Sequence, residues 1–175
     1  MKRLFISLTA LFFISFLNDS FAQAKPKAGK AKNMVKDHPF KATYSSNFTI
    51  GKAAYSKMIL DLWKDWDDNN FDRHDYMADS LVAFFPDGTV TRGKAENLEA
   101  SKKFRGKFAS VKSIIHAWVP LTSTDMNEDV VCVWGQEEDT YPDGKVEKSD
   151  LHEVWWFNKA GKVTRLRQWA AKFGE

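Results

Sequence analysis

The sequence is poor in the residues that redox, metal and nucleotide chemistry require. Its 175 residues include one cysteine, so no disulfide can form within the chain, and Cys132 in VVCVW is expected to be a small buried side chain. The four histidines, His38, His74, His116 and His152, are too widely spaced to match a metal-binding motif. Neither a glycine-rich phosphate loop nor a GxSxG motif occurs. The sequence therefore predicts no metal and no cofactor.

An excess of basic charge is also lacking in the part of the chain that is expected to fold. The net charge is +3 and the pI is about 8.9. Residues 1–37 contain seven Lys or Arg and two Asp, which leaves −2 for residues 38–175. The basic pI therefore comes from the N-terminal segment, and no nucleic-acid partner is predicted for the domain.

One long hydrophobic run is present, Leu4–Leu17, and its fourteen residues fall short of the roughly 20 that span a membrane. It follows the basic start MKR and precedes Ser20 and Ala22, which have the small-residue spacing of a signal-peptidase site. We predict a signal peptide over residues 1–22, a secreted or periplasmic protein, and no stable membrane span after cleavage. An uncleaved anchor is the alternative.

The segment that follows, residues 23–47, begins rich in Lys and Ala and contains Pro26 and Gly29. It shows no apolar period at its start, so a flexible basic linker is predicted. A solvated tether and an arm that touches an anionic surface both fit this composition. Residues 48–175 are then long enough for one domain with a substantial core.

Three helices are predicted before residue 110. The first covers residues 52–68 and the third covers residues 93–108, where Ala100, Phe104 and Phe108 recur every four residues. Between them, residues 71–78 suggest a short second helix with Asp72 as N-cap. The apolar stripe of the first helix consists of Tyr55, Met58, Ile59, Leu62, Trp63 and Trp66.

After the predicted helices, the spacing of apolar residues becomes that of β-strands. Residues 80–92 read as a short strand pair around PDG, and from residue 111 the apolar period becomes two, with turns at YPDGK and NKAGK. Helices followed by long hairpin strands indicate the α+β class, with the three helices covering one face of a curved antiparallel sheet.

The order of these elements resembles the nuclear transport factor 2-like superfamily, and within it the SnoaL-like proteins. The resemblance is carried by LWKDWDDNNFD, MADSLVAFFPDGTVTRGK and HEVWWFNKAGKVTRLRQW, and it extends from Ile50 to Phe173. It implies a cone-shaped sheet with a pocket at its open end. Members include isomerases, polyketide cyclases, epoxide hydrolases and dehydratases, as well as binding and dimerisation modules, so the fold alone does not give the function.

The strand around residues 150–157 carries the first site hypothesis. Alternation puts His152 and Asp150 on one face and Glu153 on the other, and aromatic residues lie on both. We take the His152 face as the inner one, with His152 as acid or base and Asp150 as its support. His116 could meet His152 across the sheet. The alternative is that both histidines are satisfied core or interface residues.

Two further carboxylates are candidates for catalysis. Glu153 lies among apolar residues, which would raise its pKa and suit a general acid, but an ion pair with Arg165 or Arg167 is the preferred interpretation. Asp79 lies where, by the resemblance, several enzymes keep an acidic residue near the pocket. In non-enzymes the same position caps the turn into the strand.

The chain has seven tryptophans, which suit an aromatic pocket for a planar or lipophilic ligand. Core packing and a dimer interface are the alternative explanation. The predicted pocket residues are Tyr55, Trp63, His116, Trp118, Trp134 and Trp156.

Two functions are consistent with these observations. In the first, an exported SnoaL-like protein binds a small lipophilic or aromatic molecule, with or without metal-free acid–base chemistry of the isomerase, cyclase or hydrolase type. In the second, the domain is a non-catalytic homodimer or protein-interaction module. Whether the protein is an enzyme stays open at this point.

Overall fold

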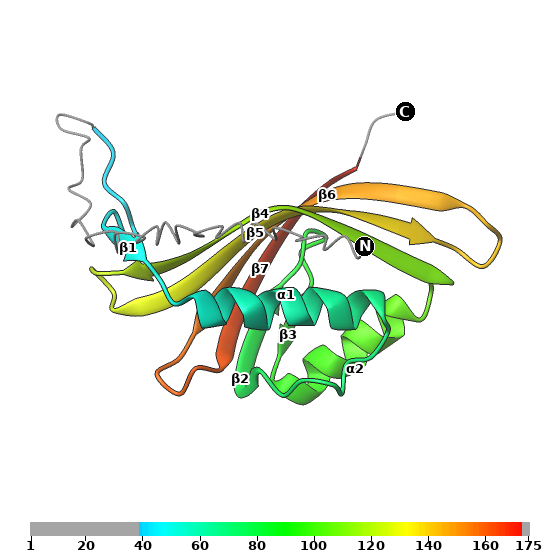
Figure 1. Cartoon of the computed structure of the whole chain (residues 1–175), viewed down its shortest axis with the longest axis horizontal. Helices are drawn as coiled ribbons and strands as arrows, with labels where there is room; N and C mark the ends of the chain where they lie inside the picture. Colours follow the sequence, from blue (N-terminus) through cyan, green and yellow to red (C-terminus); the bar gives the residue numbers. More distant parts are fainter. Residues whose placement is uncertain (1–38, 173–175) are drawn as a thin grey trace, which may run out of the picture.

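A computed structural model of the protein describes residues 39–172 (Figure 1). The predicted signal peptide and most of the predicted linker lie outside these residues. The elements in chain order are β1 Phe48–Ile50, α1 Ala53–Asp67, β2 Met77–Phe84, β3 Val90–Arg92, α2 Lys94–Arg105, β4 Ser110–Ser123, β5 Glu128–Thr140, β6 Val146–Phe157 and β7 Val163–Lys172.

All seven strands form one sheet in the order β1-β4-β5-β6-β7-β2-β3. The long hairpins β4–β5–β6–β7 are antiparallel, as predicted, and the β2–β3 pair forms around the expected PDG turn. One pairing departs from the predicted antiparallel sheet, because β2 runs parallel to β7. The sheet is strongly curved, and both helices lie on the same side of it (Figure 1).

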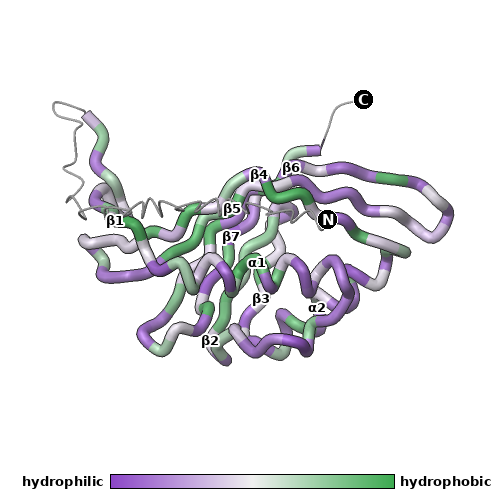
Figure 2. The backbone as a smooth tube through the Cα atoms, in the orientation of Figure 1, coloured by the Kyte–Doolittle hydropathy of each residue, from purple (hydrophilic) through white to green (hydrophobic). Residues whose placement is uncertain are grey.

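The helix α1 crosses the concave side of the sheet and supplies much of the core. Its Tyr55, Ile59 and Trp63 are buried, as the apolar stripe predicts. The ring of Trp63 packs on Gly135 of β5, where an added Cβ would lie 2.8 Å from the indole. Hydrophobic residues gather along the central strands, whereas the helices and the tip of the β5–β6 hairpin are largely hydrophilic (Figure 2).

The predicted short helix over residues 71–78 is wrong. This segment forms turns and then enters β2 at Met77, so the described residues contain two α-helices rather than three. Its acidic residues bind across the structure instead of capping a helix: Asp72 pairs with Lys102 of α2, and Asp75 pairs with both Lys94 and Lys162. These ion pairs tie the segment to neighbouring elements.

Residues 44–47, which precede the predicted boundary at residue 48, are hydrogen-bonded to the β4–β5 hairpin. The carboxylate of Asp125, in the β4–β5 turn, accepts hydrogen bonds from the backbone N–H groups of Ser46 and Asn47 and from the hydroxyl of Ser45. The hydroxyl of Tyr44 donates to Glu128. Within residues 39–172, neither helix is long and apolar enough to cross a membrane.

Candidate functional site

The inner face of β6 is the one that carries Glu153. Leu151, Glu153, Trp155 and Phe157 are buried on this side, facing the helices. The sequence-based choice of the His152 face as the inner one is therefore wrong for the geometry of the cone. Aromatic residues occupy both faces, and this is why alternation alone could not distinguish them.

A cavity of about 650 Å³ lies between this inner face and the two helices. A volume of this size is typical of sites for small organic molecules. Eight of its lining residues are aromatic: Trp63, Trp66, Phe71, Phe85, Phe104, Phe108, Tyr141 and Trp155. Six are acidic: Asp65, Asp87, Glu137, Asp139, Glu147 and Glu153. We call this space the cone cavity.

Glu153 is held inside the cavity wall by three donors. Its Oε2 accepts hydrogen bonds from the indole nitrogens of Trp63 at 2.6 Å and Trp155 at 2.9 Å, and its Oε1 accepts one from Gln168 at 2.7 Å. Burial raises the pKa of Glu153, and these three bonds oppose that rise. Since all its partners are structural, Glu153 is an anchor that joins α1 to the sheet.

The preferred ion pair of Glu153 with Arg165 or Arg167 does not form. Both arginines lie on the outer face, where they stack on aromatic rings. The Arg165 guanidinium is 5.1 Å from the Trp156 ring, and that of Arg167 is 4.9 Å from Phe84.

Two carboxyl groups of β5, those of Glu137 and Asp139, line the same cavity and have raised pKa values. Burial and the nearby carboxylate of Asp139 raise the pKa of Glu137 to about 8, and burial raises the pKa of Asp139 as well. The Oδ1 atom of Asp139 is buried and accepts no hydrogen bond from the described residues while both groups are ionised. A protonated Glu137 would supply that donor, and with a pKa of about 8 the Glu137 carboxyl is largely protonated at neutral pH.

A third acidic group, Asp65 of α1, lines the same cavity. Its Oδ2 lies 2.7 Å from Nδ1 of His74, and its Oδ1 lies 3.3 Å from the Arg73 guanidinium without accepting a hydrogen bond from it. His74 is half-buried and stacks on the ring of Tyr76.

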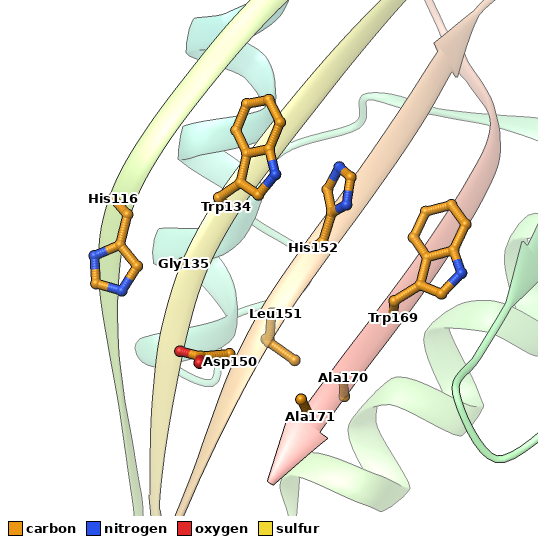
Figure 3. Close-up of a pocket in the computed structure, with 9 residues that line it drawn as sticks. All are labelled: His116, Trp134, Gly135, Asp150, Leu151, His152, Trp169, Ala170 and Ala171. Atoms are coloured by element: carbon orange, nitrogen blue, oxygen red, sulfur yellow. The ribbon is translucent and has the colours of Figure 1, made fainter. Parts of the chain in front are cut away.

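The outer face of the sheet holds a second, more open depression of about 480 Å³. Figure 3 shows His116, Trp134, His152 and Trp169 in a row from four neighbouring strands, with the helices behind the sheet. The His152 ring stacks between Trp134 at 5.0 Å and Trp169 at 5.3 Å. Burial lowers the pKa of His152, and its Nε2 has no hydrogen-bond partner among the described residues.

The predicted catalytic residues are thus divided between the two faces. His152 and Asp150 line the outer depression, and Glu153 lines the cone cavity. Asp79 is exposed on β2, at the irregular stretch between Met77 and Val82, and lines neither space. The catalytic role of these residues stays a prediction, but the geometry does not bring them together.

The predicted pocket residues are divided in the same way. Trp63 lines the cone cavity, while Tyr55 stacks on Phe157 at 4.2 Å within the core. His116 and Trp134 line the outer depression, and Trp156 packs on the outer side against Tyr44.

Strand alternation puts Trp118 on the same face as His116, but in the structure the two side chains lie on opposite faces. A β-bulge between Ile115 and Ala117 shifts the register, so that Trp118 pairs with Val133 and lies on the inner side. It is 51% exposed there and lines neither the cone cavity nor the outer depression.

Glu137 and Asp139 were missed by reasoning from the sequence. The signal was present, because the alternation of buried Val131 and Val133 continues through Gly135 to Glu137 and Asp139 on one face of β5. A run of acidic residues such as QEED usually indicates a solvent-exposed strand end, so it did not suggest the wall of a cavity. Among residues 39–172, no group of three or more His, Cys, Asp or Glu side chains could hold a metal ion.

Several solved structures have this fold. An NTF2-like protein of unknown function from Burkholderia pseudomallei is 13% identical, with a TM-score of 0.55 over 67% of this chain and 90% of that chain. A putative SnoaL-like polyketide cyclase from Shewanella denitrificans is 11% identical, with a TM-score of 0.54 over 69% of this chain and 92% of that chain. SalBIII, an epoxide hydrolase/cyclase-like enzyme in pyran ring formation of the polyether salinomycin, is 12% identical, with a TM-score of 0.54 over 67% and 91%.

These similarities confirm the resemblance predicted from the sequence at the level of the fold, which is that of the NTF2-like and SnoaL-like proteins. No family model matches the chain, and its sequence matches no curated protein.

Proposed function

We propose that this protein is an exported small-molecule-binding protein whose cone cavity performs metal-free proton transfer on its ligand. The observation that carries the proposal is the Glu137–Asp139 pair on the wall of a cavity of about 650 Å³. A carboxyl group with a pKa of about 8 exists in both protonation states near neutral pH, so it can act as an acid or as a base. Isomerase, cyclase and hydrolase chemistry all need such a group.

The cavity supports this role by its aromatic lining. Apolar walls exclude water, and this strengthens the interaction of a carboxyl group with a ligand. Structural neighbours that include a putative polyketide cyclase and an epoxide hydrolase/cyclase-like enzyme are compatible with this class of chemistry.

A simple proton-transfer probe tests the proposal. Conversion of cyclohex-3-enone to the conjugated cyclohex-2-enone requires a base to remove a proton from C2 and an acid to return one at C4. We expect the wild-type protein to accelerate this conversion, followed by proton NMR, and Glu137→Gln to lower the rate on the order of 100-fold or more, as for loss of a general base. Glu138→Gln, on the other face of the same strand, should keep the rate.

Retention of the full rate by Glu137→Gln would contradict the role of Glu137. If His152→Ala lost the rate instead, the outer depression and the Asp150–His152 pair would be the reacting site.

A second function, as a homodimer or interaction module, is favoured by the exposed aromatics of the outer face. Trp134 is 38% exposed and Trp169 is 46% exposed, in a row with His152. Aromatic patches of this kind are common at protein interfaces. We expect Trp169→Ala to convert a dimer to a monomer in light scattering, and Trp118→Ala, an exposed tryptophan of the inner side, to leave the mass unchanged. A monomeric wild type would remove this alternative.

A further inference from the structure

We propose that the ligand of the cone cavity is an organic cation, a protonated amine on an apolar body, with its ammonium group between the Glu137–Asp139 pair and the aromatic wall. The inference rests on the proposed function of the same cavity, and it adds the charge and the chemical class of the ligand.

The charged side chains of the cavity wall are mostly acidic. Among the lining residues that the structure describes, six are acidic and one is basic, Lys172 at the end of β7, whose Nζ lies 3.6 Å from Glu147. Arg105 acts on Asp139 only through its charge, because its donors are bound to the backbone oxygens of Trp66, Asp67 and Phe108. The Glu137–Asp139 pair therefore lacks a direct cationic partner among the described residues.

One side of the cavity is a continuous aromatic wall. Four ring contacts join five side chains from α1, α2 and the adjoining segments into one surface. Trp66 lies 5.7 Å from Phe71 and 6.2 Å from Phe104, and Phe108 lies 5.3 Å from Phe104 and 5.1 Å from Tyr141. The electron-rich faces of such rings attract cations, and they repel anions.

Two carboxylate oxygens of the cavity lining accept no hydrogen bond from the described residues. Asp65 is only 2% exposed, lines the cavity, and has an Oδ1 that accepts no hydrogen bond; the same holds for the buried Oδ1 of Asp139. Buried acceptors without donors cost free energy. A protonated Glu137 can donate to Asp139, but once Glu137 is ionised both oxygens need an N–H or O–H group from elsewhere. An ammonium group supplies up to three donors, and it adds the directly bound positive charge that Asp139 lacks.

A proton balance follows from this arrangement. The charged or titratable groups that share the cavity with Glu137 or act on the pair are Asp139 of β5, Tyr141 after β5, Glu147 and Glu153 of β6, Lys172 of β7, Asp65 of α1, Asp87 after β2 and Arg105 of α2. A bound cation favours the ionised form of Glu137, so the Glu137 proton should leave as the cation enters. A neutral ligand would leave that proton in place.

Three probes of similar size separate these cases: 2-phenylethylamine, which is cationic, 2-phenylethanol, which is neutral, and 3-phenylpropanoate, which is anionic. Isothermal titration calorimetry at pH 7, in phosphate and in Tris, measures affinity and proton release together. We expect the amine to bind at least tenfold more tightly than the alcohol and to release roughly one proton. The affinity for the amine should rise between pH 6 and pH 8, and the anion should not bind.

Two variants test whether Glu137 causes the preference for the amine and the proton release. Glu137→Gln should reduce the affinity for the amine to that for the alcohol and abolish proton release, whereas Glu138→Gln should change neither. Equal binding of amine and alcohol without proton release would overturn the cationic ligand but leave the proposed function intact. Absence of binding by all three probes would overturn this inference, and together with an unaccelerated enone conversion it would overturn the proposed function as well.

Discussion

The free energy of unfolding should fall as the pH rises from about 4.5 to about 8, and Glu137→Gln should remove most of that fall. The reason is the raised pKa of Glu137, from 4.5 to about 8 in the folded protein. Below pH 4.5 the group is protonated in both states. Between the two pKa values the unfolded chain releases the proton and the folded protein keeps it, so unfolding becomes more favourable as the pH rises.

The expected size of this effect is large for a single side chain. The slope approaches about 1.4 kcal/mol per pH unit, and the total loss is on the order of 3–5 kcal/mol. Gln resembles a protonated Glu and can donate its amide N–H to Asp139. The variant should therefore match the wild type at pH 5 and be the more stable of the two at pH 9.

Asp139 and Glu153, whose pKa values are also raised by burial, add to the fall in the same direction. Carboxylates whose pKa values are lowered act in a different window and do not hide the effect. Hydrogen bonds to Lys64 and Arg73 lower the pKa of Asp68, and hydrogen bonds to Lys94 and Lys162 lower that of Asp75. Their contribution is present above their ordinary pKa values and is lost only as the pH falls through the lowered ones. Stability should thus decline on both sides of a maximum near pH 4 to 5.

Urea unfolding followed by tryptophan fluorescence at pH 5, 7 and 9 measures this dependence. Glu138→Gln is the matched control, because Glu138 lies on the same strand with Lys148 at 2.8 Å and its pKa is lowered. Parallel pH curves for the wild type and Glu137→Gln would show that Glu137 titrates normally in the folded protein.

The fold could be predicted from the sequence where one periodicity dominated. The stripe of α1 and the alternation of β5 and β6 were sufficient to identify these elements. Residues 71–78 misled because Asp72 and Asp75 have the spacing of helix-capping residues, yet they bind Lys102 and Lys94 across the fold. Such long-range ion pairs leave no local pattern in the sequence.

The site was harder to predict, for two physical reasons. First, a strand with tryptophans on both faces does not reveal which face the helices cover, and here they cover the Glu153 side. Second, the bulge at His116 moves Trp118 to the opposite face, and a one-residue insertion of this kind cannot be read from alternation. The division of the predicted site between two faces follows from these two features.

Glu153→Ala should be the most destabilising of the carboxylate substitutions, with a loss of about 2–4 kcal/mol in the free energy of unfolding. The substitution leaves the indole N–H groups of Trp63 and Trp155 and the amide of Gln168 without their acceptor. Water in the adjoining cavity can reach some of these donors, and this is why the cost stays below that of three fully buried unpaired groups. Urea unfolding at pH 6 measures the loss.

Glu153→Gln is the informative partner of this variant. Its side-chain oxygen can accept from both indoles, and its amide can donate to Gln168 once the Gln168 amide turns over. If hydrogen bonding to α1 is what Glu153 contributes, Glu153→Gln should lose less than about 1 kcal/mol. The indole N–H signals of Trp63 and Trp155 should keep their wild-type NMR shifts in Glu153→Gln and move in Glu153→Ala. A loss under 1 kcal/mol for Glu153→Ala would instead mean that the packing of Trp63 on Gly135 holds α1 to the sheet without the carboxylate, and Glu153 would then return to the list of proton carriers.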